Sequence, residues 1–280
     1  MNNDSNVSNE NEQVSKPGRD GSWGAAALDW AEAQEGTMQP IFEAVLDKVG
    51  VGPGTAVLDV GCGTGLLCKL AIERGATAAG MDASPTQLEV ARERVPDAEF
   101  TLGEMEQLPY GDGQFDLITC SNALQYSLDP KGTLAEMKRI TKPGGTVAII
   151  TGTRTRGSGP GGMGAFYSSL TELREKTSGP STGAPRLVFS DPDAVSRYMG
   201  EVGLEQYDEE EVDCDWDYPD LGTALRGGLS FAPGVRIIRY AGKEKVYAMV
   251  TETLEPFKTE SGGYHIPSRS RYVLGRAQES

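Results

Sequence analysis

Long apolar runs, a secretory signal and paired cysteines are all missing from this sequence of 280 residues. The longest strongly apolar segment spans 147–150, far short of the roughly 18 residues that a membrane-spanning helix needs. The N-terminus has no basic region followed by an apolar one, so we expect no secretory signal. The four cysteines show no C-x-x-C spacing and indicate no disulfide framework. These absences predict a reduced, cytoplasmic protein.

Positive charge is also scarce. Lys and Arg number 26 against 41 Asp and Glu, which gives a net charge of −15. Neutralising phosphates requires a basic stripe, so this balance predicts neither a nucleic-acid partner nor a membrane partner. Half of residues 201–220 are acidic and none is Lys or Arg. This acidic segment fits either a negative rim that attracts a cationic acceptor or, the commoner case, a solvated strand face.

The composition is otherwise that of a globular protein, with 38% hydrophobic and 24% charged residues. At about 150 residues per domain, the length allows one elaborated domain or two. Residues 1–22 are rich in Asn, Ser, Glu and Gly, which predicts a disordered leader. We interpret residues 23–280 as a single domain.

Between residues 50 and 151, short apolar runs alternate with helical patterns. The runs predict strands at 55–60, 76–81, 99–102, 115–120 and 146–151. The amphipathic patterns predict helices at 24–35, 38–49, 66–74, 84–94 and 131–141. Buried strands separated by helices are typical of a doubly wound, parallel sheet, so we predict an α/β fold.

After residue 151 the pattern loosens. Six glycines within 152–164 predict a loop, and helices are expected at 164–176, before residue 200, and as one long helix at 233–257. Alternation with a period of two predicts a strand at 209–218, and a last strand is expected at 270–274. We interpret 152–189 and 219–257 as lid and substrate elements, with Arg154 and Arg156 as candidates to line the lid.

The strongest chemical signal is a glycine-rich turn, VLDVGCGTG at 57–65, between a predicted strand and a predicted helix. Ligands bind at the carboxyl ends of strands in open parallel sheets, and glycine lets the backbone approach them. Leu66 stands where a dinucleotide fingerprint needs Gly or Ala, which argues against a pyrophosphate cradle. There is no Gly-Lys-Ser or Gly-Lys-Thr triphosphate loop. Asp82 ends the second predicted strand, where a carboxylate fits ribose hydroxyls or a helix cap.

Five motifs occur in order: LDVGCGTG at 58–65, MDASP at 81–85, GEMEQLPY at 103–110, FDLI at 115–118 and KPGG at 142–145. Together they resemble the class I S-adenosylmethionine-dependent methyltransferases, in the branch similar to ubiquinone and menaquinone biosynthesis enzymes. The resemblance covers residues 37–151. It implies a Rossmann-like, mostly parallel, seven-stranded sheet with helical lid insertions, its final strands at about 204–218 and 268–276.

The resemblance also implies a site for S-adenosylmethionine, with S-adenosylhomocysteine as product. Asp59 would lie near the ammonium group and Asp82 would hold the ribose hydroxyls. Glu104 stands where the family usually has Asp and would accept a hydrogen bond from the adenine. The residues that the resemblance assigns to the cofactor are Asp59, Gly61, Cys62, Gly63, Thr64, Gly65, Asp82, Ala83, Glu104, Met105 and Asn122.

The expected reaction is in-line transfer of a methyl group to an O or N atom of a small molecule, and alignment supplies much of the catalysis. Gln125 stands where the family often carries His, and it cannot abstract a proton. His265, the only histidine, and its neighbour Tyr264 are the candidates for acid–base work or substrate contact, with a solvent-exposed loop as the alternative. The candidate substrate-binding residues are Gln125, Tyr126, Phe166 and Trp216. No metal site is expected.

Trp23 and Trp30 are candidates to cover the cofactor, although burial in a helical core explains them equally well. Three other functions stay open from the sequence: a cyclase that binds S-adenosylmethionine without transferring methyl, an NAD-dependent oxidoreductase, and an acidic interaction module. We expect a monomer or homodimer.

Overall fold

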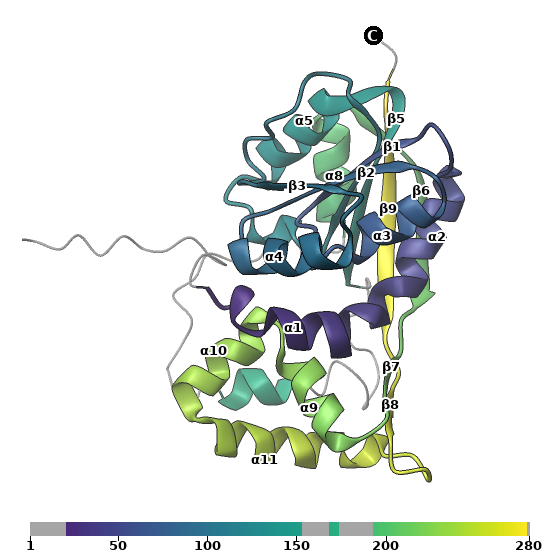
Figure 1. The fold of residues 1–280 in the computed structure, drawn as a ribbon. Coiled ribbons are helices and arrows are strands. Elements are labelled where there is room, and N and C mark those ends of the chain that lie inside the picture. The colour runs from purple at the N-terminus through teal and green to yellow at the C-terminus, as the bar shows by residue number, and fades with distance from the viewer. Residues whose placement is uncertain (1–20, 153–167, 174–192, 279–280) are drawn as a thin grey trace, which may run out of the picture.

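The structure is a computed structural model that describes residues 21–152, 168–173 and 193–278. A sheet with helices on both faces lies above a smaller helical lobe, and a helical segment runs between them (Figure 1). Residues 1–20 of the leader predicted at 1–22 and residues 153–164 of the loop predicted at 152–164 lie outside the described residues, as do Arg154, Arg156 and Phe166.

The sheet has seven strands in the order β3-β2-β1-β4-β5-β9-β6. β9 is antiparallel to its neighbours β5 and β6, while β1 to β5 pair in parallel. The predicted Rossmann-like fold class is therefore confirmed. The strands are β1 (Ala56–Val60), β2 (Thr77–Asp82), β3 (Glu99–Leu102), β4 (Phe115–Ser121), β5 (Thr141–Gly152), β6 (Leu204–Asp213) and β9 (Arg269–Ala277).

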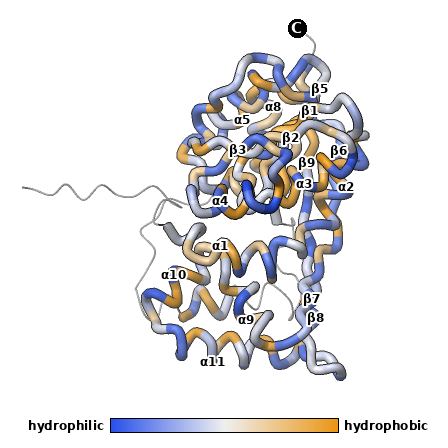
Figure 2. The backbone as a smooth tube through the Cα atoms, in the orientation of Figure 1, coloured by the Kyte–Doolittle hydropathy of each residue, from blue (hydrophilic) through white to orange (hydrophobic). Residues whose placement is uncertain are grey.

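Apolar side chains fill both faces of the sheet, and Figure 2 shows the hydrophobic colour concentrated along its strands. One buried cluster joins the sheet to α2, α3 and α4, and the other joins it to α5 and α8. Burial on both faces explains why these strands read as apolar runs rather than as alternating patterns. The helices are α2 (Gln39–Val49), α3 (Leu66–Glu73), α4 (Pro85–Arg94), α5 (Pro130–Ile140) and α8 (Ala194–Glu201).

Residues 21–38, here called the bridging segment, lie between the sheet and the lobe (Figure 1). They form the short helical pieces η1 (Gly24–Ala26), α1 (Ala27–Asp29), η2 (Trp30–Gln34) and η3 (Glu35–Met38). The predicted helix at 24–35 is thus present but irregular, because η2 is a π-helix. π-Helical turns are rare in proteins, and those that occur often lie at functional sites.

The lobe has a core of its own, built around Trp216, Tyr218, Val246 and Val250. It contains β7 (Trp216–Tyr218) paired with β8 (Tyr264–Ile266), α9 (Leu221–Leu229), α10 (Ala232–Ala241), α11 (Lys243–Leu254), η5 (Glu255–Phe257) and the helical residues 168–173.

Two predictions for this part of the chain are wrong. The long helix expected at 233–257 is broken at Gly242, whose φ of 84° does not continue a helix. The strand expected at 209–218 is divided, since β6 ends at Asp213 in the main sheet and β7 begins at Trp216 in a two-stranded one. Within the described ranges, no helix has both the length and the hydropathy needed to cross a membrane. All four cysteines are buried and free.

Candidate cofactor pocket

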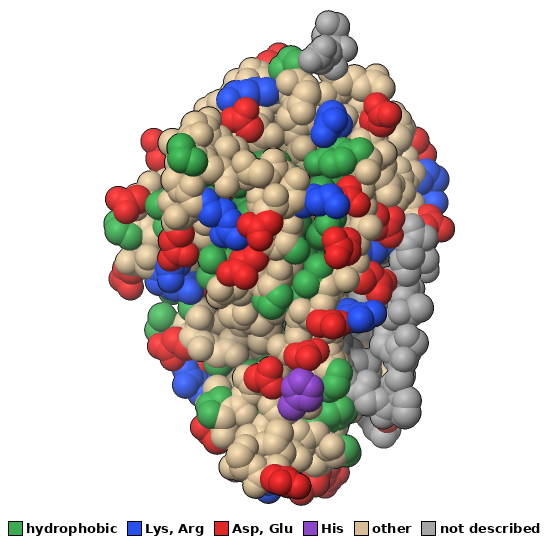
Figure 3. Space-filling view, turned by 90° about the vertical axis from the view of Figure 1, so that its right-hand side faces the viewer, with side chains coloured by type: hydrophobic (Ala, Val, Ile, Leu, Met, Phe, Trp, Pro, Cys, Tyr) green, Lys and Arg blue, Asp and Glu red, His purple; other side chains and the backbone are tan. Residues whose placement is uncertain are grey.

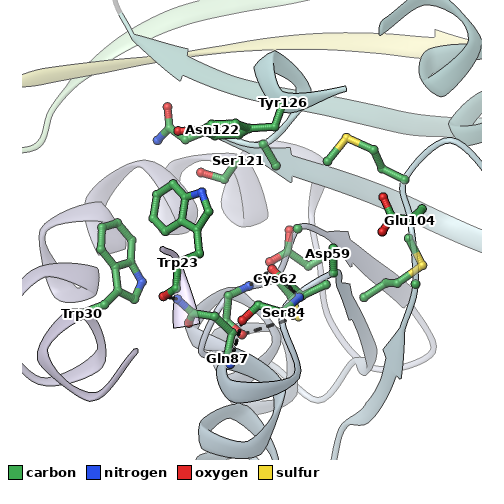
Figure 4. Close-up of a pocket in the computed structure, with 18 of the residues that line it drawn as sticks. Trp23, Trp30, Asp59, Cys62, Ser84, Gln87, Glu104, Ser121, Asn122 and Tyr126 are labelled. Carbon is green, nitrogen blue, oxygen red and sulfur yellow. Dashed lines mark hydrogen bonds between the residues drawn. The ribbon is translucent and has the colours of Figure 1, made fainter. Parts of the chain in front are cut away.

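A pocket opens at the carboxyl ends of β1, β2 and β4, against the bridging segment (Figure 4). Its position is the one that the strand order of an open parallel sheet favours for ligands. Most of the residues that the family resemblance assigns to the cofactor line it together, although they come from four separate parts of the sequence. These are Asp59, Gly61, Cys62, Gly63, Asp82, Ala83, Glu104, Met105 and Asn122. Thr64 and Gly65 are buried beside the pocket but do not line it.

The turn after β1 needs its glycines for two different reasons. Gly61 and Gly63 have φ values of 79° and 54°, in the left-handed region that side chains disfavour. A Cβ atom at Gly61 would also lie only 2.4 Å from the Cβ atom of Ala123. The amide of Gly61 donates to the carbonyl of Met81 over 2.7 Å, which holds the turn against the end of β2.

Asp82 is tied to the same turn. Its Oδ2 accepts a hydrogen bond from the Gly63 amide at 3.0 Å, and its Oδ1 accepts one from the Ser84 amide at 2.8 Å. Ser84, rather than Asp82, is the N-cap of α4, since its hydroxyl accepts from the Gln87 amide. Burial raises the pKa of Asp82, and the three backbone amides at Ser84, Gly63 and Ala83 oppose that rise. Each carboxylate oxygen retains a lone pair for a ligand hydroxyl.

Asp59 is the most deeply placed carboxyl group of the pocket, with 3% of its surface exposed. Burial raises its pKa to about 7, and the nearby charges of Glu35 and Asp82 add to the rise. The Thr119 hydroxyl donates a hydrogen bond of 2.7 Å to Asp59 Oδ1, and this bond opposes the rise in the pKa of Asp59. A cationic group bound beside Asp59 would favour its ionised form.

Asn122 follows β4 and has a φ of 48°, the one positive φ among non-glycine residues in the described part of the chain. Backbone strain of this kind persists where the surrounding structure fixes it, and it clusters at functional sites. The Asn122 amide donates to the carbonyl of Ile150 at 2.9 Å, so the strain is held by β5.

The aromatic wall of the pocket comes from Trp23, Trp30 and Tyr126. Trp23 packs edge-on against both of the others, with ring centroids 5.8 Å from Trp30 and 5.7 Å from Tyr126. Figure 4 shows Trp23 between Trp30 and the side of the pocket formed by Asn122 and Tyr126. Both tryptophans are half-buried, line the pocket and pack against the core of the lobe. A role in covering the cofactor stays a prediction.

Sequence reasoning missed several lining residues, among them Glu35, Met38, Phe42 and Gln87. Met38 and Phe42 both lie in the helix predicted at 38–49, whose amphipathic pattern gave no signal that either reaches a ligand. Gln87 is 2% exposed, and its Oε1 has no hydrogen-bond partner among the residues that the structure describes. A buried acceptor without a partner is costly and points to a donor that a ligand would bring.

His265 and Tyr264 do not line this pocket. Both lie on β8 in the lobe, where Tyr264 is buried in the core. His265 is exposed, with its Nδ1 atom 2.8 Å from Asp217 Oδ1 and its Nε2 atom 3.8 Å from Asp215. Figure 3 shows this single histidine on the surface among acidic side chains. The solvent-exposed alternative therefore describes its position.

The remaining candidate substrate residues are divided. Tyr126 lines the pocket and Gln125, next to it in η4 (Leu124–Tyr126), does not. Trp216 is 4% exposed in the core of the lobe and does not line the pocket. Phe166 lies outside the described residues.

The acidic segment at 201–220 also lies away from the pocket. Asp208 pairs with Lys48 at 2.5 Å, Glu209 with Arg271 at 3.0 Å and Glu201 with Lys131 at 2.8 Å. Basic side chains of neighbouring elements thus balance several of its charges. The preferred interpretation, a strand face rather than a rim for a cationic acceptor, fits this pairing.

The fold is Rossmann-like, and its pocket lies where open parallel sheets bind ligands. Residues 58–149 match the methyltransferase domain family, and this region forms a class I, S-adenosylmethionine-dependent methyltransferase domain. The chain is 41% identical over 105 residues to a demethylmenaquinone methyltransferase of Renibacterium salmoninarum, covering 38% of this chain and 44% of that protein. It is 32% identical over 145 residues to a malonyl-(acyl-carrier protein) O-methyltransferase of Serratia marcescens, covering 52% and 56%.

The chain thus spans about half the length of these curated relatives. Among solved structures, the (4+2)-cyclase SpnF has a similar fold, with a TM-score of 0.54 and 18% identity, covering 86% of this chain and 81% of that one. The cofactor of the methyltransferase family is S-adenosylmethionine.

The residues present fit that cofactor. The Gly61–Gly63 turn lines the pocket, and a Cβ atom at Gly63 would meet nothing closer than 3.8 Å, which leaves space for an amino-acid tail. Asp59 suits the ammonium group of that tail. Asp82 suits a pair of ribose hydroxyls, and the orphaned Gln87 Oε1 is ready to accept from a ligand donor.

Proposed function

We propose that this protein is an S-adenosylmethionine-dependent methyltransferase that moves a methyl group to an O or N atom of a small-molecule acceptor. The observation that carries the proposal is the meeting of Asp59, Asp82 and the Gly61–Gly63 turn in one pocket at the carboxyl ends of the strands. That combination matches an amino acid joined to a nucleoside and supplies no cradle for a pyrophosphate.

When bound, S-adenosylmethionine supplies an electrophilic methyl group on a positively charged sulfur. The task of the chain is then to orient the cofactor and the acceptor relative to each other. Asp82 would hold the ribose and Asp59 the ammonium group, while Glu104 and Met105 would contact the adenine. Trp23, Trp30 and Tyr126 would form an apolar wall beside the bound cofactor. Alignment of this kind contributes roughly 7–11 kcal/mol to lowering a reaction barrier.

No Lys, Arg or His side chain lines the pocket in the described part of the chain. A general base in this pocket would therefore be a carboxylate rather than an imidazole or an amine, and an acceptor that is already nucleophilic would need no base. The same observation supports the second candidate, a cyclase that binds S-adenosylmethionine without using its methyl group, as the shared fold with a cyclase allows.

Isotopic labelling separates the two. The full chain is incubated with S-adenosylmethionine labelled in its methyl group and with a panel of phenols, carboxylic acids and amines. A methyltransferase yields labelled product together with S-adenosylhomocysteine. Saturable binding without any transfer of label across the panel would favour the cyclase.

We also propose a small-molecule acceptor rather than nucleic acid, because of the net charge of −15. A cytoplasmic location is proposed from the four buried thiols, none of which forms a disulfide.

A monomer or homodimer remains the expected oligomeric state, and light scattering of the purified chain would measure it.

A further inference from the structure

The bridging segment is fastened to the lobe by charged side chains. Arg226 of α9 donates from Nε to Asp29 Oδ1 at 2.7 Å and from Nη2 to Glu32 Oε2 at 2.5 Å. The segment therefore follows the lobe, and Figure 1 shows it lying directly against α9 and α10.

The other side of the segment is fastened to α4 of the sheet domain. Gln87 donates from Nε2 to the carbonyl of Trp23 at 2.9 Å. Two turns further along α4, Arg94 Nη1 lies 2.5 Å from Glu35 Oε2. One helix thus holds both ends of the segment that carries the tryptophan wall of the pocket.

Arg94 also holds the glycine turn. The same Nη1 atom lies 2.8 Å from the carbonyl oxygen of Thr64 and 2.8 Å from its hydroxyl. The second oxygen of Glu35, Oε1, accepts from the Leu66 amide at 3.4 Å, at the start of α3. Glu35 therefore reaches the turn twice, directly at Leu66 and through Arg94 at Thr64.

The Glu35 and Thr64 sides of these contacts are buried, whereas the Arg94 side chain is 30% exposed. Glu35 is 4% exposed and Thr64 is fully buried. Removing one partner of a buried ion pair leaves an uncompensated charge, which is far more costly than losing a surface pair. Undocking the bridging segment would take Glu35 away from both Arg94 and the Leu66 amide. The end of the turn at Thr64–Leu66 would then lose these contacts, while Gly61 and Gly63 would keep theirs to Met81 and Asp82.

We propose that Glu35 and Arg94 are positioning residues that couple docking of the bridging segment to the conformation of the glycine turn. Docking and turn geometry then form one equilibrium. This inference rests on the proposed function only in its last step: a cofactor that requires the turn also holds Trp23 and Trp30 in place over itself.

Amide hydrogen exchange on the free, full-length protein tests the coupling without any ligand. The variants are Glu35→Gln, at one end of the network, and Thr64→Val, at the other. Asp47→Asn is the matched control, because the Asp47–Arg74 pair at 3.0 Å joins α2 to the end of α3 and lines no part of the pocket. Thr64→Val is the gentler variant and keeps the test valid if Glu35→Gln does not fold.

Each variant is expected to speed exchange at least tenfold at the opposite end. Glu35→Gln should speed exchange of the amides of residues 61–66, and Thr64→Val should speed exchange of those of residues 30–38. The control Asp47→Asn should change the exchange rate of neither segment. Exchange that increases only at the substituted end would overturn the proposal.

Titration with S-adenosylhomocysteine then tests the last step. Binding to the wild type should slow exchange at 61–66 and 21–38 together, and Glu35→Gln should weaken binding at least fivefold and confine protection to 61–66. Wild-type protein that shows the coupling but binds no S-adenosylhomocysteine would contradict the proposed function alone. Binding by Glu35→Gln that is unchanged, with protection spreading to 21–38, would contradict the positioning role alone.

Discussion

The amide of Gly63 donates a hydrogen bond of 3.0 Å to the carboxylate of Asp82, 19 residues further along the chain. This contact joins the turn after β1 to the end of β2, so the carboxylate is oriented before any ligand arrives. Pre-orientation lowers the cost of ordering a side chain on binding. The two strongest sequence signals of the chain are thus parts of one structure.

Replacing Asp82 with Ala should weaken binding of S-adenosylhomocysteine at least tenfold. The loss of an acceptor for buried donors costs about 1–3 kcal/mol, and the Gly63 and Ser84 amides lose their partner as well. Calorimetric titration measures the change. Asp112→Ala is the control, since Asp112 pairs with Arg139 on the surface. Equal affinities for wild type and Asp82→Ala would mean that the ribose lies elsewhere.

Asp59→Asn should alter stability in a pH-dependent way. Because burial raises the pKa of Asp59 to about 7, the folded protein keeps this proton up to higher pH than the unfolded chain does. The wild type therefore loses stability as pH rises from about 4 to about 7, at up to about 1.4 kcal/mol per pH unit from this group. The Asn variant lacks this loss, and its amide oxygen still accepts from Thr119. Denaturant unfolding at pH 5 and pH 8 measures this. The free energy of unfolding of the variant, relative to that of the wild type, should be higher at pH 8 than at pH 5.

The same substitution should harm ligand binding. Affinity of the wild type for S-adenosylhomocysteine should rise as pH increases through about 7, because ionised Asp59 attracts the ammonium group. Asp59→Asn should bind more weakly at pH 8 and lose this pH dependence. A wild-type affinity that is flat between pH 5.5 and 8 would remove Asp59 from the ammonium site.

Gly61→Ala should destabilise the fold, because its methyl group would lie 2.4 Å from the Cβ atom of Ala123. The double variant with Ala123→Gly removes that clash and should recover part of the lost stability, leaving the cost of a side chain at φ 79°. Thermal unfolding of the two proteins gives the comparison. No recovery in the double variant would show that the clash is not the cause.

Gly63→Val should have the opposite profile, with folding retained and binding lost. A Cβ atom at Gly63 meets nothing closer than 3.8 Å, and it faces Gln87, Trp30 and Glu35 at the pocket. The fold should tolerate the substitution at the cost of backbone strain, while the side chain fills ligand space. A folded variant with wild-type affinity would show that the turn does not approach the ligand.

His265→Ala tests the catalytic role predicted for the lone histidine. Since His265 pairs with Asp217 outside the pocket, we expect affinity for S-adenosylhomocysteine and methyl transfer to stay within about twofold. The hydrogen bond to Asp217 raises the pKa of His265. Any stability from this pair is therefore present at low pH and disappears as pH rises above the raised pKa. Activity that falls at least tenfold would place His265 near the acceptor.

The sequence was most informative where the local pattern of apolar residues is enough to determine a strand or a helix. The apolar runs and caps between residues 50 and 151 predicted every strand from β1 to β5, since local pattern and burial agree there. The lobe was less predictable. Gly242 ends a helix whose apolar pattern continues on both sides, and its positive φ separates α10 from α11. The pattern alone outweighed this single glycine in the prediction.

The pocket was likewise predictable where motifs form it and not where tertiary contacts do. Asp59, Asp82 and the glycine turn stand in recognisable segments. Glu35 and Gln87 have no such signal, because each matters through a partner 59 or 64 residues away. His265 shows the converse: a residue type suited to catalysis carries no information about which side of the lobe it faces.

Calorimetric titration of the full chain with S-adenosylhomocysteine and, in parallel, with NADH tests the central claim most directly. The account predicts a saturable, single-site isotherm with S-adenosylhomocysteine and no heat of binding with NADH. A single-site isotherm with NADH and none with S-adenosylhomocysteine would contradict it.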